Sequence, residues 1–370
     1  MEKLKYTRVE ECCEILDSMR IPITASDRKE GKYPYYGANG IQDYVNDYIF
    51  DDELVLLAED GGNFGSKEKP IAYRVSGKCW VNNHAHVLKP KEEIDVDYLC
   101  YSLMFYKVDG MINGATRKKL TQTAMKKMKI PLRNIVEQKK IVQQLNKIIE
   151  IREKAKKELN LLDNLIQARF VEMFGDPITN SKLLPIEKIE ERYFLKAGIT
   201  TKAEDIHDYL KDKYEIPCYG GNGIRGYVEN LSYEGCYPII GRQGALCGNV
   251  QYATGKFHAT EHAVLVSTLK NDNTMWVYYM LKLMDLYRYH TGAAQPGLAV
   301  KKLNTIDVIV ADINLQNQFA AFVHQINKSK FVIHKFLYCT THNTKSIIKP
   351  RPNTKESGKT RGGKPYADEF

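Results

Sequence analysis

The sequence predicts an α+β protein with two similar mixed α/β domains, separated by long helices that form an antiparallel coiled coil. Three observations support this fold class. A glycine-rich motif occurs twice, strand-like segments bounded by turn residues accompany it in both places, and each copy leads into a segment with the same apolar helical period.

The duplication is the most direct of these observations. Residues 36–41 read Tyr-Gly-Ala-Asn-Gly-Ile, and residues 219–224 read Tyr-Gly-Gly-Asn-Gly-Ile. Further along, His84 returns as His262. The repeat is far longer than the roughly 20–50 residues of a solenoid unit, so it indicates a tandem domain duplication. Two similar modules imply two similar binding tasks; the alternative is a duplicated scaffold in which one half no longer works.

Turn and breaker residues delimit the two domains. The first globular block is expected at residues 1–134, where apolar stretches bounded by Gly, Asn and Asp indicate strands and Pro131 closes the block. The second block is expected at residues 181–312. A central long helix and its linker are expected between them, at residues 135–180.

Both helical segments carry an apolar seam with heptad spacing. The central helix is expected from Glu137 to about Phe174, where Gly175 and Pro177 end it. Its seam is Ile141, Leu145, Ile148, Arg152, Ala155, Leu159, Leu162 and Ile166. The matching seam of the second helix, expected at residues 313–340, is Phe319, Val323, Ile326, Lys330, Ile333 and Leu337. Matching seams predict a coiled coil rather than two unrelated surface helices.

The second helix is expected to be shorter than the first. Thr340 stands where the first helix has Leu162, and residues 341–370 are rich in Thr, Lys, Gly, Pro and Ser without an apolar period. This composition predicts a basic, disordered tail. A shortened partner would leave Leu162, Ile166 and Phe170 without seam contacts, at about 1.5–3 kcal/mol for each fully buried large side chain.

Composition indicates a soluble globular protein with a basic surface. A chain of 370 residues with an apolar fraction of 43% can form two domains with separate cores. No apolar run reaches the roughly 20 residues of a membrane span, and the N-terminus lacks the apolar stretch of a signal peptide. Eight cysteines without a CxxC pair fit a reducing cytosol, so a cytoplasmic protein without a membrane partner is expected. The net charge of +9 suggests a polyanionic partner such as a nucleic acid.

Catalytic motifs are weak in this sequence. Residues 258–262 read His-Ala-Thr-Glu-His, the H-x-x-E-H form of a zinc peptidase motif. That motif works on a helix, whereas here it runs into the strand-like residues 263–266. Residues 357–360 echo the end of a phosphate-binding loop, but Asn353 takes the place of its first glycine. We therefore expect a non-catalytic protein without a cofactor or metal of its own; a zinc-dependent hydrolase using residues 258–262 is the alternative.

The glycine-rich loops are the candidate binding surfaces. Glycine lets backbone approach a ligand closely, and Asn can pair with adenine as Arg or Lys pairs with guanine. The candidate DNA-contacting residues in the first block are Tyr36, Asn39, Asp60, Asn63, Asn82, Asn83, His84, Arg117 and Lys118. In the second block they are Tyr219, Asn222, Arg225, Arg242, Gln243, Thr260, His262 and Gln295. Different side chains at matching positions would give the two modules different base preferences; ordinary turn chemistry is the alternative for each residue.

A set of loose motifs in a fixed order carries a family resemblance. These are Tyr-Pro-Tyr-Tyr-Gly-Ala-Asn-Gly-Ile at 33–41, Leu-Leu-Ala-Glu-Asp-Gly-Gly-Asn at 56–63, Ile-Pro-Leu at 130–132, Glu-Gln-Lys-Lys-Ile-Val at 137–142, and Phe-Val-Glu-Met-Phe-Gly-Asp-Pro at 170–177. With them, the chain resembles the DNA-specificity subunit of type I restriction-modification systems over about residues 7–337.

The resemblance implies two target-recognition domains separated by two long helices. Each domain would read one half of a bipartite site in double-stranded DNA, and the helices would set the spacing and dock methyltransferase subunits, which restriction subunits join. S-adenosylmethionine, ATP and Mg would belong to those partners. The shortened second helix implies weaker methyltransferase docking. A tandem-module scaffold that binds protein or glycan is the remaining alternative.

Overall fold

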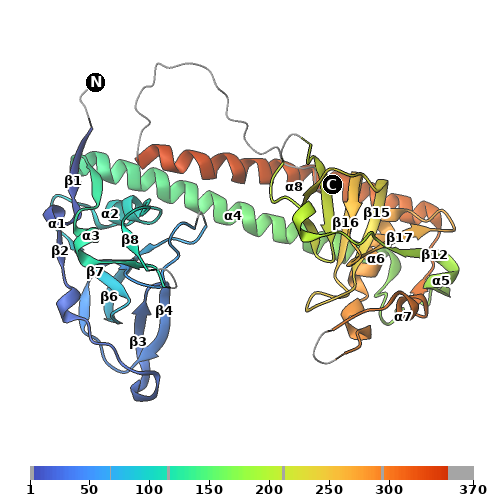
Figure 1. Cartoon of the computed structure of the whole chain (residues 1–370), viewed down its shortest axis with the longest axis horizontal. Coiled ribbons are helices and arrows are strands. Elements are labelled where there is room, and N and C mark those ends of the chain that lie inside the picture. The colour runs from blue at the N-terminus through green and yellow to red at the C-terminus, as the bar shows by residue number, and fades with distance from the viewer. Residues whose placement is uncertain (1–3, 67, 115–116, 211–212, 293–295, 349–370) are drawn as a thin grey trace. The chain divides into compact units, whose positions relative to one another are not determined.

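The computed structural model describes residues 4–66, 68–114, 117–210, 213–292 and 296–348, the last eight by their backbone alone. The chain divides into two compact units, each built around one six-stranded sheet (Figure 1). The first unit extends through Lys154 and includes the end of the last helix from Leu337 onwards, and the second unit is Ala155–Phe336.

The sheet of the first unit has the strand order β2-β7-β5-β6-β3-β4. The β3–β6 pair is parallel and the other neighbours in this order are antiparallel. Its strands are β2 (Cys13–Ile15), β3 (Glu30–Gly37), β4 (Gly40–Val45), β5 (Phe50–Ala58), β6 (Ala72–Val81) and β7 (Ala85–Pro90). Two small ladders accompany it: β1 (Lys5–Arg8) with β10 (Lys129–Leu132), and β8 (Ile112–Asn113) with β9 (Lys119–Leu120). Its shorter helices are α1 (Val9–Cys12), η1 (Asp17–Met19), η2 (Ala25–Asp27), α2 (Val96–Leu103) and α3 (Gln122–Lys126).

The second unit repeats this topology, with the strand order β12-β17-β15-β16-β13-β14 and a parallel β13–β16 pair. Its strands are β12 (Tyr193–Ala197), β13 (Ile216–Gly220), β14 (Gly223–Val228), β15 (Tyr233–Gly241), β16 (Val250–Ala259) and β17 (Ala263–Thr268). The ladder of β11 (Ile186–Lys188) and β18 (Asp307–Ile309) repeats that of β1 and β10. Its shorter helices are α5 (Ile189–Arg192), η3 (Ala203–Asp205), α6 (Thr274–Leu283), η4 (Leu286–Tyr289) and α7 (Val300–Asn304). The predicted duplication and the α+β class are confirmed.

Two long helices complete the fold, α4 (Ile135–Phe174) and α8 (Ile313–Ile348) (Figure 1). The side chain of Asn134 accepts from the Glu137 backbone amide at 2.9 Å, which satisfies one of the free amides at the start of α4. At its other end Gly175 adopts φ +82°, the left-handed conformation that ends many helices.

The expected end of the second helix at residue 340 is wrong. α8 continues to Ile348, so the part of the predicted tail at residues 341–348 is helical. The low apolar content of this segment hid the helix, because Thr, His, Asn and Lys are tolerated in a helix even though they provide no seam. The remainder of the predicted tail, residues 349–370, lies outside the described residues.

In the second unit, α4 and α8 run antiparallel. The rings of Phe170 and Phe319 meet edge-on with centroids 5.3 Å apart, and Lys330 Nζ lies 2.7 Å from Asp163 Oδ1. In one direction along the helix pair, residue numbers therefore rise in α4 and fall in α8. In the first unit, Arg152 donates to the Leu337 carbonyl at 2.9 Å, so a charged seam residue of α4 binds the backbone of α8.

Antiparallel packing corrects the expected loss of seam contacts near the end of α4. Ile166 and Phe170 are fully buried, and Leu162 is half-buried. Phe170 and Phe174 of α4 form one aromatic cluster with Trp276 of α6 and Phe319 of α8. The sequence comparison therefore assigned the wrong contacts to the end of α4. In the antiparallel pair, the end of α4 packs against the start of α8.

A buried glutamine joins each long helix to the short helix of its own sheet. Gln138 is fully buried, accepts from the Asp95 amide at 2.9 Å, and donates to the carbonyls of Glu93 and Arg133, both at 2.8 Å. Asp95 is the N-cap of α2. This side chain therefore fixes the start of α4 against the start of α2.

Gln316 makes the equivalent contacts in the second unit. It is fully buried and accepts from the amide of Asn273, the N-cap of α6, at 2.8 Å. Its amide group donates to Asp272 Oδ1 at 2.7 Å and to the Ala311 carbonyl at 3.0 Å. The two units thus join their long helices to their sheets through equivalent glutamine hydrogen bonds. In the second unit, a side-chain carboxylate replaces one of the backbone carbonyl acceptors.

That carboxylate belongs to a buried ion pair of the second unit. Arg192 Nε and Nη2 each lie 2.6 Å from an oxygen of Asp272, and both residues are buried. Burial alone would lower the pKa of the Arg192 guanidinium, but the hydrogen bonds and charge of Asp272 raise it above its ordinary value. The pair is thus bidentate, with two parallel N–H···O contacts.

The first unit has an apolar pair in the same place. The Lys91 amide donates to Cys12 O as the Leu269 amide donates to Arg192 O, each at 3.0 Å, so these two acceptor residues are equivalent. Ile94 directly precedes the N-cap of α2, the position that the carboxylate holds before α6. Cys12 and Ile94 are both buried. The same backbone therefore accepts either an ion pair or an apolar pair.

We predict strong coupling between Arg192 and Asp272. Arg192→Cys and Asp272→Ile should each destabilise the second unit by about 3–5 kcal/mol, because the first leaves the buried Asp272 without a cation and the second leaves Arg192 only its contact with Glu187 at 3.3 Å. The double variant, which copies the first unit, should recover most of that loss. The measurement is urea unfolding followed by fluorescence of Trp276 in a Trp80→Phe background.

The control is the exposed pair Lys202–Glu204, whose side chains are 77% and 74% accessible. Replacing both with Ala should change stability by less than about 0.5 kcal/mol. A double variant no more stable than the worse single variant would contradict the coupling.

Candidate nucleic-acid interface

Three loops of the first unit are held together by backbone hydrogen bonds. The Glu59 amide donates to the His84 carbonyl at 2.8 Å, the Leu120 amide donates to the Glu59 carbonyl at 2.7 Å, and the Gly61 amide donates to Lys118 O at 3.2 Å. We call this arrangement the loop frame. It fixes the backbone beneath several predicted site residues, so their side chains start from defined positions.

The second unit has the same loop frame. The Arg242 amide donates to the His262 carbonyl at 3.1 Å, the Leu298 amide to the Arg242 carbonyl at 2.8 Å, and the Gly244 amide to Pro296 O at 2.9 Å. Arg242 therefore takes the place of Glu59, and the residues that come after them, Gln243 and Asp60, are also equivalent. Identical backbone contacts thus carry different side chains in the two units.

The Asn-Gly turns at residues 37–40 and 220–223 pack against these frames. In the first unit, Asn39 Nδ2 donates to the Gly61 carbonyl at 3.0 Å. In the second, a Cβ atom on Gly241 would lie 2.2 Å from the Gly221 carbonyl oxygen, so only glycine permits this approach of the turn to the frame. Asn222, next to Gly221, accepts from Asn249. The turns therefore present their asparagines beside the frame residues.

Predicted site residues of the first unit converge on one carboxylate. Asp60 Oδ1 lies 2.8 Å from Arg117 Nη2 and 2.7 Å from His84 Nδ1. The buried Asn82 accepts from the His84 amide at 2.8 Å and donates to Gln42 at 3.0 Å. Asn82, His84, Asp60 and Arg117 are thus joined in one chain of polar contacts that ends at an exposed guanidinium.

Other predicted residues lie elsewhere. The half-buried Tyr36 packs against Tyr73, and burial raises the pKa of its phenol. Tyr219 is buried against Phe257. Asn63 donates to the Pro70 carbonyl at 3.4 Å within its own loop. The others are exposed: Asn83 and Lys118 in the first unit, and Asn222, Arg225 and Gln243 in the second. Gln295 lies outside the described residues. A role in DNA contact stays a prediction for all of these residues.

The sequence reasoning missed a buried polar network in the first unit. Asp17 Oδ2 lies 2.7 Å from His86 Nδ1, Glu59 Oε2 lies 2.6 Å from Arg20 Nη1, and Glu59 Oε1 lies 3.0 Å from Lys119 Nζ. Asp17, Glu59 and His86 form the one His/Cys/Asp/Glu group in the described part of the chain with ligand atoms close enough to share a metal ion. Arg20 and Lys119 already supply positive charge to this group, so the network is complete without a metal.

The second unit lacks the counterparts of this network. Val264 holds the strand position of His86, because the two pair with equivalent residues of β15 and β5. Three polar atoms around this frame, Arg242 Nε, Thr260 Oγ1 and His262 Nδ1, are buried and have no hydrogen-bond partner in the described structure.

The geometry does not support the zinc alternative. His258 lies in β16, one residue before its end, and is buried, with Nε2 2.8 Å from Thr201 Oγ1 and Nδ1 hydrogen-bonded to Ser232 Oγ. Burial lowers the pKa of this imidazole. The His262 ring contacts Glu261 at 3.2 Å. Because both His258 nitrogens have protein partners and the segment is not helical, the motif does not form the paired ligand face of a zinc peptidase.

The predicted seam residues of the long helices form the less exposed face. Leu145, Ile166, Phe319 and Val323 are buried, and Ile141, Ile148, Leu159, Leu162, Ile326, Ile333 and Leu337 are half-buried. Apolar side chains also occur on the exposed face, among them Leu161, Leu165, Phe331 and Val332. None of the described helices is both long and apolar enough to cross a lipid bilayer.

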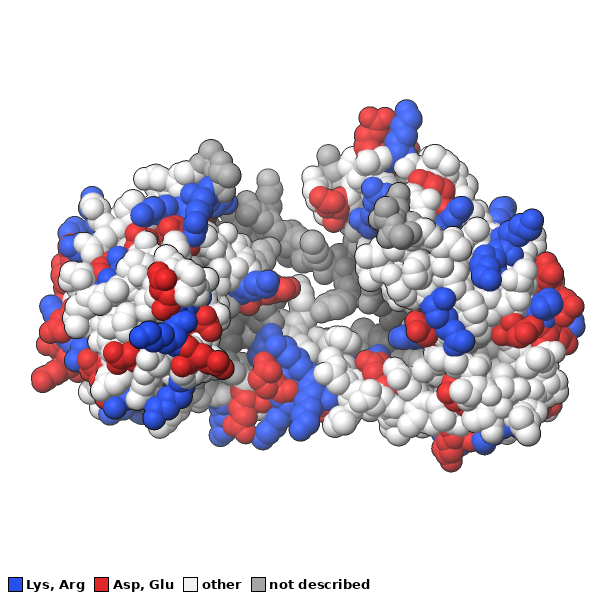
Figure 2. Space-filling model, turned by 90° about the horizontal axis from the view of Figure 1, so that it is seen from below, with Lys and Arg blue, Asp and Glu red and all other residues white. Residues whose placement is uncertain are grey.

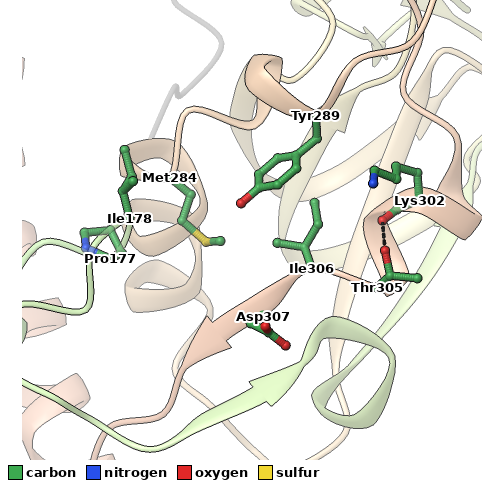
Figure 3. Close-up of a pocket in the computed structure, with 8 residues that line it drawn as sticks. All are labelled: Pro177, Ile178, Met284, Tyr289, Lys302, Thr305, Ile306 and Asp307. Atoms are coloured by element: carbon green, nitrogen blue, oxygen red, sulfur yellow. Dashed lines mark hydrogen bonds between the residues drawn. The ribbon is translucent and has the colours of Figure 1, made fainter.

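Two surface features bear less on binding. On the face seen in Figure 2, Lys and Arg are interspersed with Asp and Glu in each unit, so net charge alone does not mark a nucleic-acid surface. A pocket in the second unit lies between Met284, Tyr289, Lys302 and Asp307 (Figure 3), where Thr305 Oγ1 donates to the Lys302 carbonyl at 2.9 Å. None of the predicted site residues lines it.

The fold and the paired loop frames define a protein with two tandem recognition modules. A family model for the type I restriction modification DNA specificity domain matches residues 1–161 and 195–337. These segments make up most of the chain, which therefore belongs to this family, as the sequence motifs predicted.

Two curated relatives match part of the chain. A 133-residue segment is 46% identical to the Escherichia coli type I restriction enzyme EcoprrI specificity subunit and covers 36% of this chain and 33% of the relative. Another of 144 residues is 35% identical to the putative type I restriction enzyme specificity subunit S.HindORF215P of Haemophilus influenzae, covering 39% and 37%. Each match thus spans about a third of the relative's length.

Solved structures match over nearly the whole chain. The S subunit of the type I restriction-modification system from M. genitalium has a TM-score of 0.59 at 16% identity, covering 94% of this chain and 96% of that one. A chain from a structure on complex assembly and conformational transition of the type I R-M system has a TM-score of 0.55 at 13% identity, covering 94% and 97%. At these identities the likeness concerns the fold.

The buried network predicts acid sensitivity of the first unit. Burial alone would raise the pKa of Asp17 and of Glu59, but hydrogen bonds and charge from His86 and Arg20 lower both pKa values overall. A lowered folded-state pKa contributes stability above the unfolded value, about 3.9 for Asp and 4.3 for Glu, and that stability is lost as pH falls through the folded value. Calorimetric unfolding of the first unit should therefore shift to lower temperature below about pH 4.

The variant Asp17→Asn/Glu59→Gln tests the cause. It should unfold at a lower temperature than the parent at pH 7 and lose less on acidification, since neither side chain then titrates. Glu204→Gln, at an exposed site of the second unit, is the control and should match the parent profile. Equal acid shifts in the parent and the double variant would contradict this origin.

Proposed function

We propose that this chain is the sequence-specific DNA-recognition subunit of a type I restriction-modification complex. Each unit would read one half of a bipartite site in double-stranded DNA. The observation that supports this most directly is the duplicated loop frame, because one backbone arrangement carries Glu59 and Asp60 in the first unit but Arg242 and Gln243 in the second. A protein that reads two different half-sites needs such a shared scaffold with changed side chains.

The proposed partners are inferred from the family and from the long helices. Methyltransferase subunits would dock on α4 and α8, whose exposed apolar side chains include Leu161, Leu165 and Val332. Restriction subunits would join that assembly. Catalysis, with its S-adenosylmethionine, ATP and Mg, would reside in the partners, and the complex would work in the cytoplasm. Weak methyltransferase docking was expected from lost seam contacts, but antiparallel packing against α8 buries Ile166 and Phe170, so that reason does not apply.

Methylome sequencing tests the proposal. A host that carries this chain beside an active type I methyltransferase should gain one bipartite methylated motif that a host without the chain lacks. An unchanged methylome, with the same methyltransferase active on another specificity chain, would contradict DNA recognition by this protein.

A domain exchange tests the division of labour. Replacing residues 1–134 by the first domain of another family member should change one half of the motif and leave the other half and the spacing intact. Replacing residues 181–312 should change the other half. An exchange that altered both halves would contradict independent reading by the two units.

A further inference from the structure

The two loop frames differ most in the charge at one position. In the first unit, Glu59 is a half-buried carboxylate with Arg20 at 2.6 Å and Lys119 at 3.0 Å, so its charge is matched within the protein. In the second unit, the same position is Arg242, for which the described structure shows no carboxylate partner within ion-pair distance. A half-buried guanidinium without a counter-ion is costly unless a ligand completes it.

Unpartnered atoms gather around this arginine. Arg242 Nε, Thr260 Oγ1 and His262 Nδ1 are all buried, and the described residues offer none of them a hydrogen-bond partner. The Arg242 amide donates to the His262 carbonyl at 3.1 Å, and the Ala263 amide donates to the Thr260 carbonyl at 2.9 Å. The three side chains therefore belong to neighbouring, hydrogen-bonded backbone segments of the frame. Thr260 is fully buried. Buried polar atoms are nearly always satisfied, so these three atoms are available to ordered water or to a polar ligand.

The backbone around the cluster leaves room for such a ligand. Gly244 adopts φ +81°, and a Cβ atom there would meet nothing within 4 Å, so this side of the loop is open. On the other side a Cβ on Gly221 would lie 3.1 Å from the His262 carbonyl oxygen, so the turn is packed against the frame. The backbone of Arg242 is thus hydrogen-bonded in the frame, two residues before a glycine whose added Cβ would meet none of the described residues within 4 Å.

The chemistry of the cluster favours a base edge. A guanidinium whose Nε is buried and whose backbone is hydrogen-bonded in the frame has less freedom than an exposed one, and its planar fork suits the paired O6 and N7 acceptors of guanine in the major groove. A phosphate contact needs charge but little orientation, and exposed lysines and arginines serve it well. Partial burial therefore distinguishes Arg242 from the exposed Arg225 of β14.

Building on the proposed function, we infer that Arg242 reads a guanine in the half-site of the second unit, with the partly exposed ring of His262 beside that base. The first unit cannot read a guanine from the same frame position, because Glu59 carries a negative charge. Arg20 is engaged by Glu59 at 2.6 Å, and the exposed guanidinium at this frame is Arg117, held by Asp60 at 2.8 Å. Equivalent backbone therefore gives the half-sites different guanine positions.

Two variants with opposite expectations test this inference. Arg242→Lys keeps the charge but loses the planar fork, so methylation should no longer require guanine at one position in one half-site, while the other half-site stays unchanged. Arg288→Lys, at an exposed arginine of η4 in the same unit, is the matched control and should leave the whole motif unchanged. An Arg242→Lys methylome identical to that of the parent would overturn the assignment.

A second measurement changes the DNA of the parent complex first. The parent complex is titrated by fluorescence anisotropy with duplexes in which 7-deazaguanine replaces one guanine at a time, which removes the N7 acceptor. Affinity should fall on the order of 10-fold or more at one guanine of the second unit's half-site. The same substitution should have no further effect on the Arg242→Lys complex, and the slope of affinity against salt should stay unchanged.

The outcomes separate this inference from the proposed function. If the parent chain directs no motif, the proposed function fails. If the parent directs a motif but every 7-deazaguanine duplex binds as well as the unmodified one, only the guanine assignment fails. If Arg242→Lys weakens all sequences equally, Arg242 contacts a phosphate and the assignment is also overturned.

Discussion

The buried glutamine at the start of each long helix is the contact on which the rest of the architecture depends. Gln138 and Gln316 use both their donor and acceptor groups, and each joins its helix to the N-terminus of the short helix that covers its sheet. In a low-dielectric interior such a network has little freedom, because any shift leaves a buried polar group unpaired. Each sheet and its loop frame are therefore fixed on their own helix.

Away from these glutamines, the two units differ at positions where a polar pair in one unit has no polar equivalent in the other. The Arg192–Asp272 pair of the second unit stands where the first has Cys12 and Ile94, and the polar network that holds Glu59 has no counterpart around Arg242. Burying a charge is tolerable when its partner is in place, and an apolar pair of similar volume is tolerable without one. The fold thus accommodates either an ion pair or an apolar pair at such a position, provided that both residues of the pair change together.

Repeated motifs and periodic apolar residues made part of this fold predictable from the sequence. Equal glycine motifs indicated the duplication, and the seam spacing indicated the two helices. The end of α8 was not predictable, because residues 341–348 are helical without an apolar seam, nor were the partners of Phe170, because antiparallel pairing matches residues that do not align. The network around Asp17 also escaped prediction, since Gln122, which donates to that carboxylate, lies 105 residues away along the chain. Long-range polar partners leave no local pattern.

The packing of the last helix has a consequence for biosynthesis. Arg152 of α4 donates to Leu337, 185 residues further along the chain, so the first unit shares a helix contact with a segment that is made much later. At a ribosomal rate of about 5–20 residues per second, that stretch takes roughly 10–40 s to synthesise. During this interval Arg152 of the nascent α4 lacks its acceptor on α8. A chaperone, or a methyltransferase helix already present in the cell, would find its opportunity to bind at that stage.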